Sequence, residues 1–553
     1  MTGGAEPGIS AAARAESRRV IGGSALGTLF EWYDFFLYGS LASHIAAHFF
    51  AGVNETAGFI LALATFAAGF VVRPVGALVF GRIGDRAGRK NTFLITLSLM
   101  GVSTFLVGLL PGYDALGPVA PAALVALRLA QGLAIGGEFG GAVIFVAEHA
   151  PAQRRGLFTG WIPTTAVAGL LLSLVVITAT RAAMAPDAFA DWGWRVPFLV
   201  SVVLLGISLW IRWRLHESPV FLRMQAERRL SRSPLSEAFL EWRNCRLVLF
   251  ALFGVVMGQA VGYYTATFYA FFFLERIARV DPVIVTPIVM GALAVSIPVA
   301  LLAGWLSDRV GRKPVLLAGI GLGALLYFPA FGALLDAANP ALAQARRDAP
   351  VVVLAAPGEC SLLFEPVLGR SHHSSSCDVV KAFLAHAGIS HVTRPLASPG
   401  AAQLAIGGRV LAAPPAESLT GPESRTAIAE FEAQARAALV AAGYREVADP
   451  ARIDVLRIFA ILTLLMALAS VPTSVAPTLL VELFPARFRY SAVAVAQNLG
   501  NGWFGGLLPA IAFTIVAATG DVFAGLWYPV AIAATCFVVG LLAVPETRGR
   551  TID

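Results

Sequence analysis

Long apolar runs dominate this chain and constrain its fold more than any other feature. Each run is long enough to cross the ~30 Å hydrocarbon core of a bilayer as a helix, which takes about 20 residues. Inside a bilayer the chain has to satisfy its own backbone polar groups, so such runs fold as helices in a bundle. The charged share of 14% agrees, because soluble domains carry about 25% charged residues. We place twelve spanning helices, at residues 22–49, 57–80, 92–111, 118–147, 157–181, 194–213, 246–274, 283–306, 314–335, 453–481, 490–517 and 523–544.

A ten-residue cassette occurs twice, as GRIGDRAGRK at 81–90 and as GWLSDRVGRK at 304–313. Six of the ten positions agree, and each copy separates two apolar runs. This repeat predicts two related halves of six helices each. In secondary transporters the substrate site lies between such halves.

The cassettes are candidate gates at the cytoplasmic mouth. We expect Asp85 and Asp308 to bind helix N-termini and the adjacent arginines there. The basic residues also suit anchoring at the lipid headgroups, and the two interpretations are compatible. The candidate gate residues are Gly81, Asp85, Arg86, Arg89, Lys90, Asp308, Arg309, Arg312 and Lys313.

The short loops orient the chain in the membrane. Arginine and lysine gather in the loops on one side, whereas the loops after the first, third and eleventh runs hold none. Because cytoplasmic loops are enriched in these residues, both termini are expected in the cytoplasm. The same loops hold much of the basic excess behind the net charge of +7, so this charge does not indicate nucleic-acid binding.

One segment, residues 338–452, does not fit the helical pattern. It is polar, with short strand-like runs at 351–356 and 403–413 and helical patterns at 378–388 and 425–443. Alternating strand and helix signals predict a small α/β domain. The segment lies between the ninth and tenth spanning helices, so we expect an extracytoplasmic domain. A lid, a docking surface for an unknown partner and a stabilising element are its candidate roles.

The cysteines support this placement. Cys245 and Cys536 fall near or within spanning helices, where they suit small apolar fillers. Cys360 and Cys377 both fall in the inserted segment, and an even pair in an outside domain predicts a disulfide. The adjacent histidines at 372–373 do not match a defined metal-ligand spacing, so a metal site is not expected.

Five charged residues fall inside spanning helices of the first half, namely Glu31, Asp34, Arg73, Arg128 and Glu138. Charges are expensive in a bilayer and are therefore functional candidates. A carboxylate that alternates between an arginine and a proton can couple proton flow to conformation. We expect Asp34 and Arg128 to form the coupling pair, with Glu31 and Glu138 as further coupling groups and Arg73 as a substrate contact. A static ion pair that only fixes helix packing is the alternative.

The second half offers neutral hydrogen-bonding groups instead. Gln259 and Tyr263 fall in its first run, and Gln497 and Asn501 fall in its fifth. Such groups suit the orientation of a small polar solute, so all four are candidate substrate contacts. Interhelical hydrogen bonding is an equally weighted alternative for each of them.

Several longer motifs resemble the metabolite:H+ symporter family of the major facilitator superfamily. They are FEWYDFFLYG at 30–39, RPVG at 73–76, RLAQGLAIGGEFGGA at 128–142, DWGWRVPF at 191–198, RLHESPVF at 214–221 and LFPARFRYSA at 483–492. The resemblance implies a twelve-helix all-α major facilitator fold in the bacterial inner membrane and proton-driven uptake. Family substrates include organic acids such as 2-oxoglutarate (alpha-ketoglutarate), citrate and shikimate, and zwitterions such as proline and betaine. The inserted segment is a departure from the best-known members.

We therefore expect a proton-coupled importer of a small organic acid or related metabolite, working by alternating access. No catalysis is expected, and no cofactor beyond the proton gradient. A proton-coupled exporter or a facilitator on the same fold is the alternative, and a membrane receptor that uses the outer domain is a weaker one. The expected divisions are an N-terminal half (1–213), a cytoplasmic linker (214–245), three helices of the C-terminal half (246–337), the inserted domain (338–452) and the last three helices with a short tail (453–553).

Overall fold

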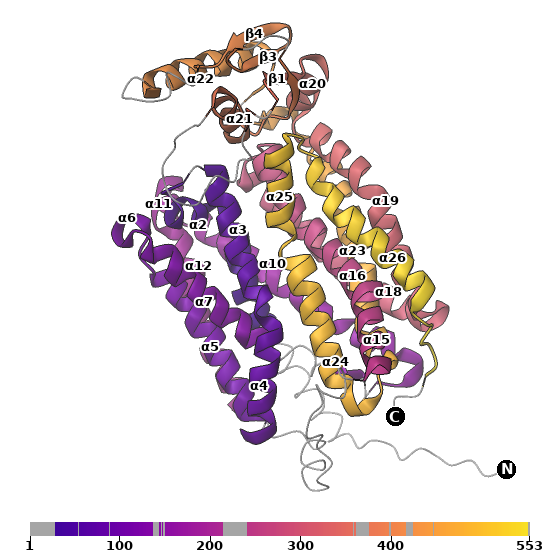
Figure 1. The fold of residues 1–553 in the computed structure, drawn as a ribbon. Coiled ribbons are helices and arrows are strands. Elements are labelled where there is room, and N and C mark those ends of the chain that lie inside the picture. The colour runs from indigo at the N-terminus through magenta and orange to yellow at the C-terminus, as the bar shows by residue number, and fades with distance from the viewer. Residues whose placement is uncertain are drawn as a thin grey trace, which may run out of the picture.

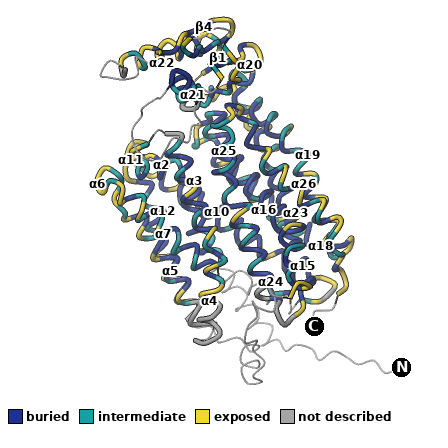
Figure 2. Tube along the Cα trace, viewed as in Figure 1, coloured by how far each residue is buried: buried dark blue, intermediate teal, exposed yellow. Residues whose placement is uncertain are grey.

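The chain forms a bundle of long helices with a small α/β unit at one end (Figure 1). Ten helices within the described residues are long and apolar enough to cross a membrane, and Leu94–Leu109 is a shorter apolar helix. Buried residues follow the contacts between the helices (Figure 2). The computed structural model describes residues 28–53, 55–87, 89–136, 143–144, 146–147, 150–213, 241–357, 359–360, 375–396, 400–415, 424–445 and 447–550.

The first half of the bundle is drawn in indigo and purple in Figure 1. A helix at 28–40 is followed, after a single turn residue, by α2 (Ala42–Phe49). The further helices of this half are α3 (Glu55–Val71), α4 (Arg73–Ala87), α5 (Arg89–Leu109), α6 (Tyr113–Leu116), α7 (Val119–Gly136), α9 (Arg155–Thr159), α10 (Trp161–Ala182), α11 (Pro186–Asp191) and α12 (Val196–Trp213).

The second half begins with a long helix, Trp242–Ile277, that contains three π-helical turns. It consists of α15 (Trp242–Ala251), η3 (Leu252–Val256), α16 (Met257–Tyr264), η4 (Thr265–Tyr269), α17 (Ala270–Phe272) and η5 (Phe273–Ile277). The remaining helices are α18 (Pro282–Val310), α19 (Arg312–Ala338), α23 (Val455–Leu483), α24 (Ala486–Leu499), the π-helical η8 (Gly500–Gly506), α25 (Leu508–Thr519) and α26 (Trp527–Ala543).

Glycines bring α7 unusually close to α3 and α4. A Cβ on Gly132 would lie 1.8 Å from the backbone oxygen of Gly69, and one on Gly136 would lie 2.0 Å from that of Arg73. Only glycine permits this approach, which small residues commonly provide between membrane helices. The contact holds the start of α4, with Arg73, against the helix that carries Arg128.

The inserted segment forms a four-stranded sheet in the order β2-β1-β3-β4. The central strand β1 (Val351–Ala355) pairs parallel with β2 (His391–Pro395) and antiparallel with β3 (Gln403–Ile406), which pairs antiparallel with β4 (Arg409–Ala412). Alternate residues of β1 are buried, as expected for a strand with one face on a core. The helices of this unit are α20 (Pro340–Asp348), α21 (Ser376–His386) and α22 (Ser424–Ala441).

The inserted unit docks on one end of the bundle, which we call the sheet end (Figure 1). The backbone N–H of His391 donates to the Gly520 oxygen (2.9 Å), and that of Ala448 donates to the Arg279 oxygen (3.0 Å). Burial at this contact lowers the pKa of His391 below its usual range. Helix α21 also contacts α3 of the first half, so the unit touches both halves of the bundle.

A disulfide joins Cys360 to Cys377, with the two Cα atoms 5.1 Å apart, as the sequence predicts. Replacing both cysteines by alanine is expected to destabilise the inserted unit by about 3 kcal/mol, because the 17-residue separation closes a loop of the size for which the chain-entropy model gives that value. Protease susceptibility of the unit in the purified protein measures this. Cys245→Ala, outside the unit, is the matched control, and equal cleavage of the double variant and the control would contradict the prediction.

Candidate functional site

A small cavity of about 60 Å³ lies between the two halves. The first half contributes residues of the helix at 28–40, α4 and α10, and the second half contributes residues of α16, α23, α24 and η8. The structure brings together all five candidate substrate residues here. The lining residues are Trp32, Phe36, Arg73, Pro163, Ala166, Gln259, Tyr263, Tyr264, Thr473, Pro477, Gln497, Asn498 and Asn501.

A chain of hydrogen bonds runs along the second-half wall of this cavity. Gln259 Nε2 donates to Asn501 Oδ1 (3.0 Å), and Asn501 Nδ2 donates to Gln497 Oε1 (2.7 Å). Asn501 lies in the π-helical turn η8, and such turns are frequent at functional sites. The Tyr263 hydroxyl has no hydrogen-bond partner within the part of the chain that the structure describes. The amides therefore orient one another, whereas the Tyr263 hydroxyl is available to a solute.

Arg73 brings positive charge to the cavity. Its side chain is 3% exposed, and its guanidinium lies over the rings of Phe70 (4.1 Å), Phe35 (4.4 Å) and Trp32 (5.4 Å). Its Nε and Nη2 have no hydrogen-bond partner within the described ranges. No carboxylate is among the lining residues of this cavity in those ranges. The rings partly compensate the buried charge, and the open donors suit an anionic group.

The pairing expected between Asp34 and Arg128 is not present in this conformation. Between these two described residues there is no ion pair within 4.0 Å. Arg128 is fully buried and donates instead to Gln131 Oε1 (2.6 Å) and to the Phe66 oxygen (3.3 Å). Asp34 is 5% exposed, and its Oδ1 has no hydrogen-bond partner among the residues that the structure describes. In this conformation backbone and amide oxygens accept from the two Nη atoms of Arg128 in place of Asp34, whereas its Nε has no hydrogen-bond partner among the described residues.

Neither Asp34 nor Glu31 lines the cavity. On the same helix the lining residues are Trp32 and Phe36, and residues at 31 and 34 fall on another helical face. The guanidinium groups of Arg73 (4.4 Å) and Arg128 (4.5 Å) both approach the ring of Phe35, which is next to Asp34 in the chain. The residue that follows Asp34 in the chain therefore contacts both arginines.

Aromatic rings join the two halves toward the sheet end. The Phe59 ring, from α3, lies 5.4 Å from the Phe272 ring and 5.4 Å from the Phe513 ring, both of the second half. The Ser43 hydroxyl donates to Glu275 Oε1 across the same boundary (2.6 Å). At this end the halves are thus in contact, mainly through apolar surfaces.

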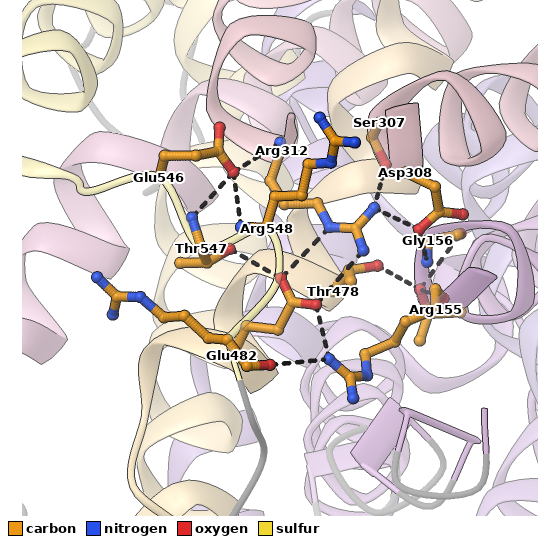
Figure 3. A network of polar contacts seen from close by, with 12 residues as sticks. Arg155, Gly156, Ser307, Asp308, Arg312, Thr478, Glu482, Glu546, Thr547 and Arg548 are labelled. Carbon is orange, nitrogen blue, oxygen red and sulfur yellow. Dashed lines mark hydrogen bonds and ion pairs between the residues drawn. The ribbon is translucent and has the colours of Figure 1, made fainter. Parts of the chain in front are cut away.

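A polar network joins the halves at the opposite end of the bundle (Figure 3). The Asp308 carboxylate, from the second cassette, accepts the backbone N–H groups of Gly156 (2.8 Å) and Leu157 (2.9 Å) of the first half. It also accepts Arg312 Nη1 (2.6 Å). Asp308 therefore binds a helix start and an adjacent arginine, the arrangement expected from the sequence.

Glu482, at the end of α23, stands at the centre of this network (Figure 3). Its carboxylate accepts Arg155 Nη1 from the first half (2.9 Å), Arg312 Nε (3.3 Å) and the Thr547 hydroxyl (2.9 Å). Its side chain has 0% exposure, and those of Arg155 and Arg312 have 8% and 1%. A buried carboxylate between two arginines holds both charges in place, and removal of one partner from such a cluster costs about 3–5 kcal/mol.

Glu546 fixes the turn of the second cassette. It accepts the backbone N–H groups of Arg312 (2.9 Å), Lys313 (3.0 Å) and Arg548 (2.8 Å). Although burial alone would raise the pKa of Glu546, these backbone donors and that of Thr547 lower it below its usual range. Gly311 has a φ of 127°, and a Cβ there would lie 2.6 Å from Glu546 Oε2. The cassette therefore needs glycine at this turn.

The residues Arg155, Glu482 and Glu546 were not expected as gate residues from the sequence. For Glu482 the sequence did contain a signal, because this carboxylate stands at the end of an apolar run and directly precedes the LFPARFRYSA motif.

Two of the candidate gate residues in the second cassette have contacts of a different kind. Arg309 lies over the Trp305 ring (3.9 Å), and Lys313 Nζ donates to the Leu541 oxygen (2.7 Å).

Some candidates cannot be placed. Glu138 lies outside the described residues, as do His372 and His373. The backbone of the first cassette is helical at 81–87 and 89–90, but the side chains of Gly81, Asp85, Arg86, Arg89 and Lys90 are outside what the structure describes.

Two groups of spanning helices, in contact at both ends and with a small cavity between them, define the class of a major facilitator transporter. The chain matches the family described as "Sugar (and other) transporter" over residues 22–241, 232–345 and 434–553. The chain therefore belongs to this family. Residues 346–433, the larger part of the inserted segment, lie outside the match.

Similar proteins include transporters from Escherichia coli (strain K12). The proline/betaine transporter is 36% identical over 328 residues, covering 57% of this chain and 64% of that protein. The alpha-ketoglutarate permease is 34% identical (58% and 72% covered) and the shikimate transporter 36% identical (58% and 73%). The matched region thus spans 64% of the length of the proline/betaine transporter. These are the kinds of transporter that the sequence motifs indicated.

Solved structures agree on the fold. The proton:xylose symporter XylE bound to 6-bromo-6-deoxy-D-glucose has a TM-score of 0.60 at 16% identity, with 98% of both chains covered. Another structure, of a D-xylose-proton symporter, has a TM-score of 0.60 at 18% identity, covering 97% of this chain and 100% of that one. At this identity the likeness concerns the fold alone.

Proposed function

We propose that this chain is a proton-coupled importer of a small carboxylate-bearing metabolite in a bacterial inner membrane. The observation that carries the proposal is Arg73, a buried guanidinium with open donors at a cavity whose described lining has no carboxylate. An incoming carboxylate would supply the missing acceptors, and the bidentate geometry of arginine suits it. The hydroxyl of Tyr263 would bind a second polar group of the substrate.

The overall architecture in this proposal is twelve spanning helices in two halves. Ten of these spans are the long apolar helices described above. The helix at 28–40 together with α2 would be one further span, and the shorter apolar helix Leu94–Leu109 would be the other. The inserted unit and the C-terminal end lie at opposite ends of the bundle (Figure 1). Because loops rich in arginine and lysine are expected in the cytoplasm, the sheet end would be extracytoplasmic and the Asp308 network would be cytoplasmic.

Proton coupling is assigned to Asp34 and Arg128. A charged carboxylate is costly when it is buried and unpaired, so in this closed state Asp34 would carry the proton. On opening to the cytoplasm, the helix at 28–40 would move relative to Arg128, and pairing of the two would release the proton. Phe35, whose ring contacts both Arg73 and Arg128, would connect this step to the substrate site. Glu31 and Glu138 stay candidates for the proton path.

Transport would proceed by alternating opening of the two ends. The contacts of Phe59 at the sheet end and of Asp308 and Glu482 at the opposite end would break in turn. In the described conformation both sets of contacts are made, and the cavity of about 60 Å³ is small compared with pockets of about 300–1,000 Å³ for drug-sized ligands. These features fit a closed intermediate and a small substrate.

The Arg73→Gln variant tests the substrate assignment. Loss of a charge-assisted hydrogen bond is worth about 1.5–3 kcal/mol, so the affinity for the anion should fall about ten- to hundredfold. Because no described carboxylate in the cavity lining pairs with Arg73, the variant should fold and keep the ligand-free melting temperature. Thermal-shift titration of the purified protein with 2-oxoglutarate, shikimate, proline and betaine measures both quantities.

The matched control is Arg347→Gln, which removes an exposed arginine paired with Asp336 (3.0 Å). It should bind every compound as the unchanged protein does. If Arg73→Gln leaves the binding of the acids unchanged, Arg73 does not hold the substrate carboxylate.

A further inference from the structure

A second and larger cavity, of about 540 Å³, lies between the inserted unit and the sheet end of the bundle, and we call it the sheet-end cavity. The inserted unit contributes residues of α21 and α22 to its wall, and the bundle contributes Phe59 of the first half and residues of α25 of the second. Val440 and Val447 also line it and are 58% and 62% exposed, so the cavity reaches the surface of the protein. Its volume falls within the range of about 300–1,000 Å³ that small-molecule sites occupy.

The sheet-end cavity ends on the aromatic contact that closes this end of the bundle. Phe59 and Phe513 both line the cavity, and their rings are 5.4 Å apart. Phe59 belongs to α3 of the first half and Phe513 to α25 of the second. The cavity therefore lies directly on the boundary at which the two halves would separate.

A column of aromatic rings leads from this boundary to the central cavity. The Phe59 ring lies 5.4 Å from that of Phe272, which lies 6.3 Å from that of Phe268. The Phe268 ring lies 5.4 Å from that of Phe36, a lining residue of the central cavity. Phe59 and Phe36 are first-half residues, whereas Phe272 and Phe268 belong to the second half. Separation of the halves at this end would therefore part the column and join the two cavities.

The inserted unit is held by the second half. It follows α19 and precedes α23, both of that half. The backbone N–H of His391 donates to the Gly520 oxygen (2.9 Å), and the backbone N–H of Val522 donates to the Ser390 hydroxyl (3.2 Å). When the halves separate at this end, the unit would move with the second half. The sheet-end cavity would then widen between the unit and Phe59.

We propose that the sheet-end cavity is the entry chamber of the transport path, and that a solute coming from this end passes beneath the inserted unit to reach the central cavity. The inserted unit is the roof of this chamber, and the ring column from Phe59 to Phe36 is its inner door. The proposal rests on the transport function proposed above, because the chamber leads inward only when the halves separate. It can nevertheless be tested without any transported solute.

Labelling of a cysteine in the central cavity tests the path. The full chain carries Thr473→Cys, with Cys245 and Cys536 replaced by alanine, in membrane vesicles whose sheet end faces a small impermeant thiol reagent. Ala387→Trp fills the chamber from the inserted unit and should slow the labelling at least about tenfold, because the reagent has to crowd past an added side chain. Ala517→Trp, which fills the chamber from α25, should have the same effect.

Three further variants complete the test. Ala412→Trp, at an exposed position of β4 outside the cavity wall, is the matched control and should leave the labelling rate unchanged. Phe59→Ala should speed the labelling, because it removes a ring of the column. Val410→Cys, 53% exposed on the same strand as the control, identifies the vesicle orientation in which the unit faces the reagent.

The proposal is overturned if Thr473→Cys is not labelled from the sheet end, or if Ala387→Trp and Ala517→Trp leave its labelling rate unchanged. Equal slowing by Ala412→Trp would also overturn it, since the effect would then not depend on the chamber. Failure of the unchanged chain to take up 2-oxoglutarate, shikimate, proline or betaine would contradict the transport function and would leave the labelling results intact.

Discussion

The Asp34→Asn variant is expected to lose uphill uptake completely while it keeps part of its substrate exchange. Asparagine has nearly the same shape but cannot take up or release a proton. A pH difference of one unit stores about 1.4 kcal/mol per proton, which supports about tenfold accumulation. In the variant the accumulation ratio should fall to one. Uptake into proteoliposomes with an imposed pH gradient, and counterflow without one, measure the two activities.

The fold should tolerate this change, because within the described ranges Asp34 forms no ion pair and its Oδ1 has no hydrogen-bond partner. Asp187→Asn, at an exposed position of α11, is the matched control and should accumulate substrate normally. If Asp34→Asn still accumulates substrate in response to the pH gradient, Asp34 is not the coupling group. Loss of counterflow together with uptake would instead assign Asp34 to substrate binding.

The Glu482→Gln variant should open the end of the bundle that Asp308 and Glu482 hold together. The change leaves Arg155 and Arg312 buried without their shared carboxylate, at a cost of about 3–5 kcal/mol to the closed state. If the open state does not bear this cost, the equilibrium moves toward it by at least about a hundredfold. A cysteine introduced at the cavity residue Thr473, with Cys245 and Cys536 replaced by alanine, reports the opening.

An impermeant thiol reagent added from the Asp308 side should label Thr473→Cys much faster in the Glu482→Gln background. The matched control is Asp336→Asn, which breaks the exposed pair with Arg347 and should leave labelling unchanged, since exposed pairs contribute about 0–1 kcal/mol. Equal labelling rates with and without Glu482→Gln would mean that this network does not hold the end closed.

The helices could be placed from the sequence because the bilayer imposes their length. The run expected at 283–306 is found in Pro282–Val310, and that at 453–481 in Val455–Leu483. In the inserted segment β2 was missed. Only the first of its five residues, His391, is buried, so this edge strand has no alternation to detect.

The candidate site was predictable in part. Polar groups inside apolar runs have to face the interior, and this rule selected all five candidates that line the cavity. The rule gives a position along a helix but not the neighbours around it, so it did not show that Gln131 and a backbone oxygen accept from the Nη atoms of Arg128. Glu482 was missed because its partners Arg155 and Arg312 lie 327 and 170 positions away.

Proton movement with the substrate is the central claim, and it can be observed directly in proteoliposomes that contain the purified chain and an internal pH dye. With 2-oxoglutarate, shikimate, proline and betaine added in turn, at least one acid should acidify the lumen. The same addition should have no effect on empty liposomes or with Asp34→Asn. Uptake of an added compound without any change of internal pH would contradict proton-coupled import.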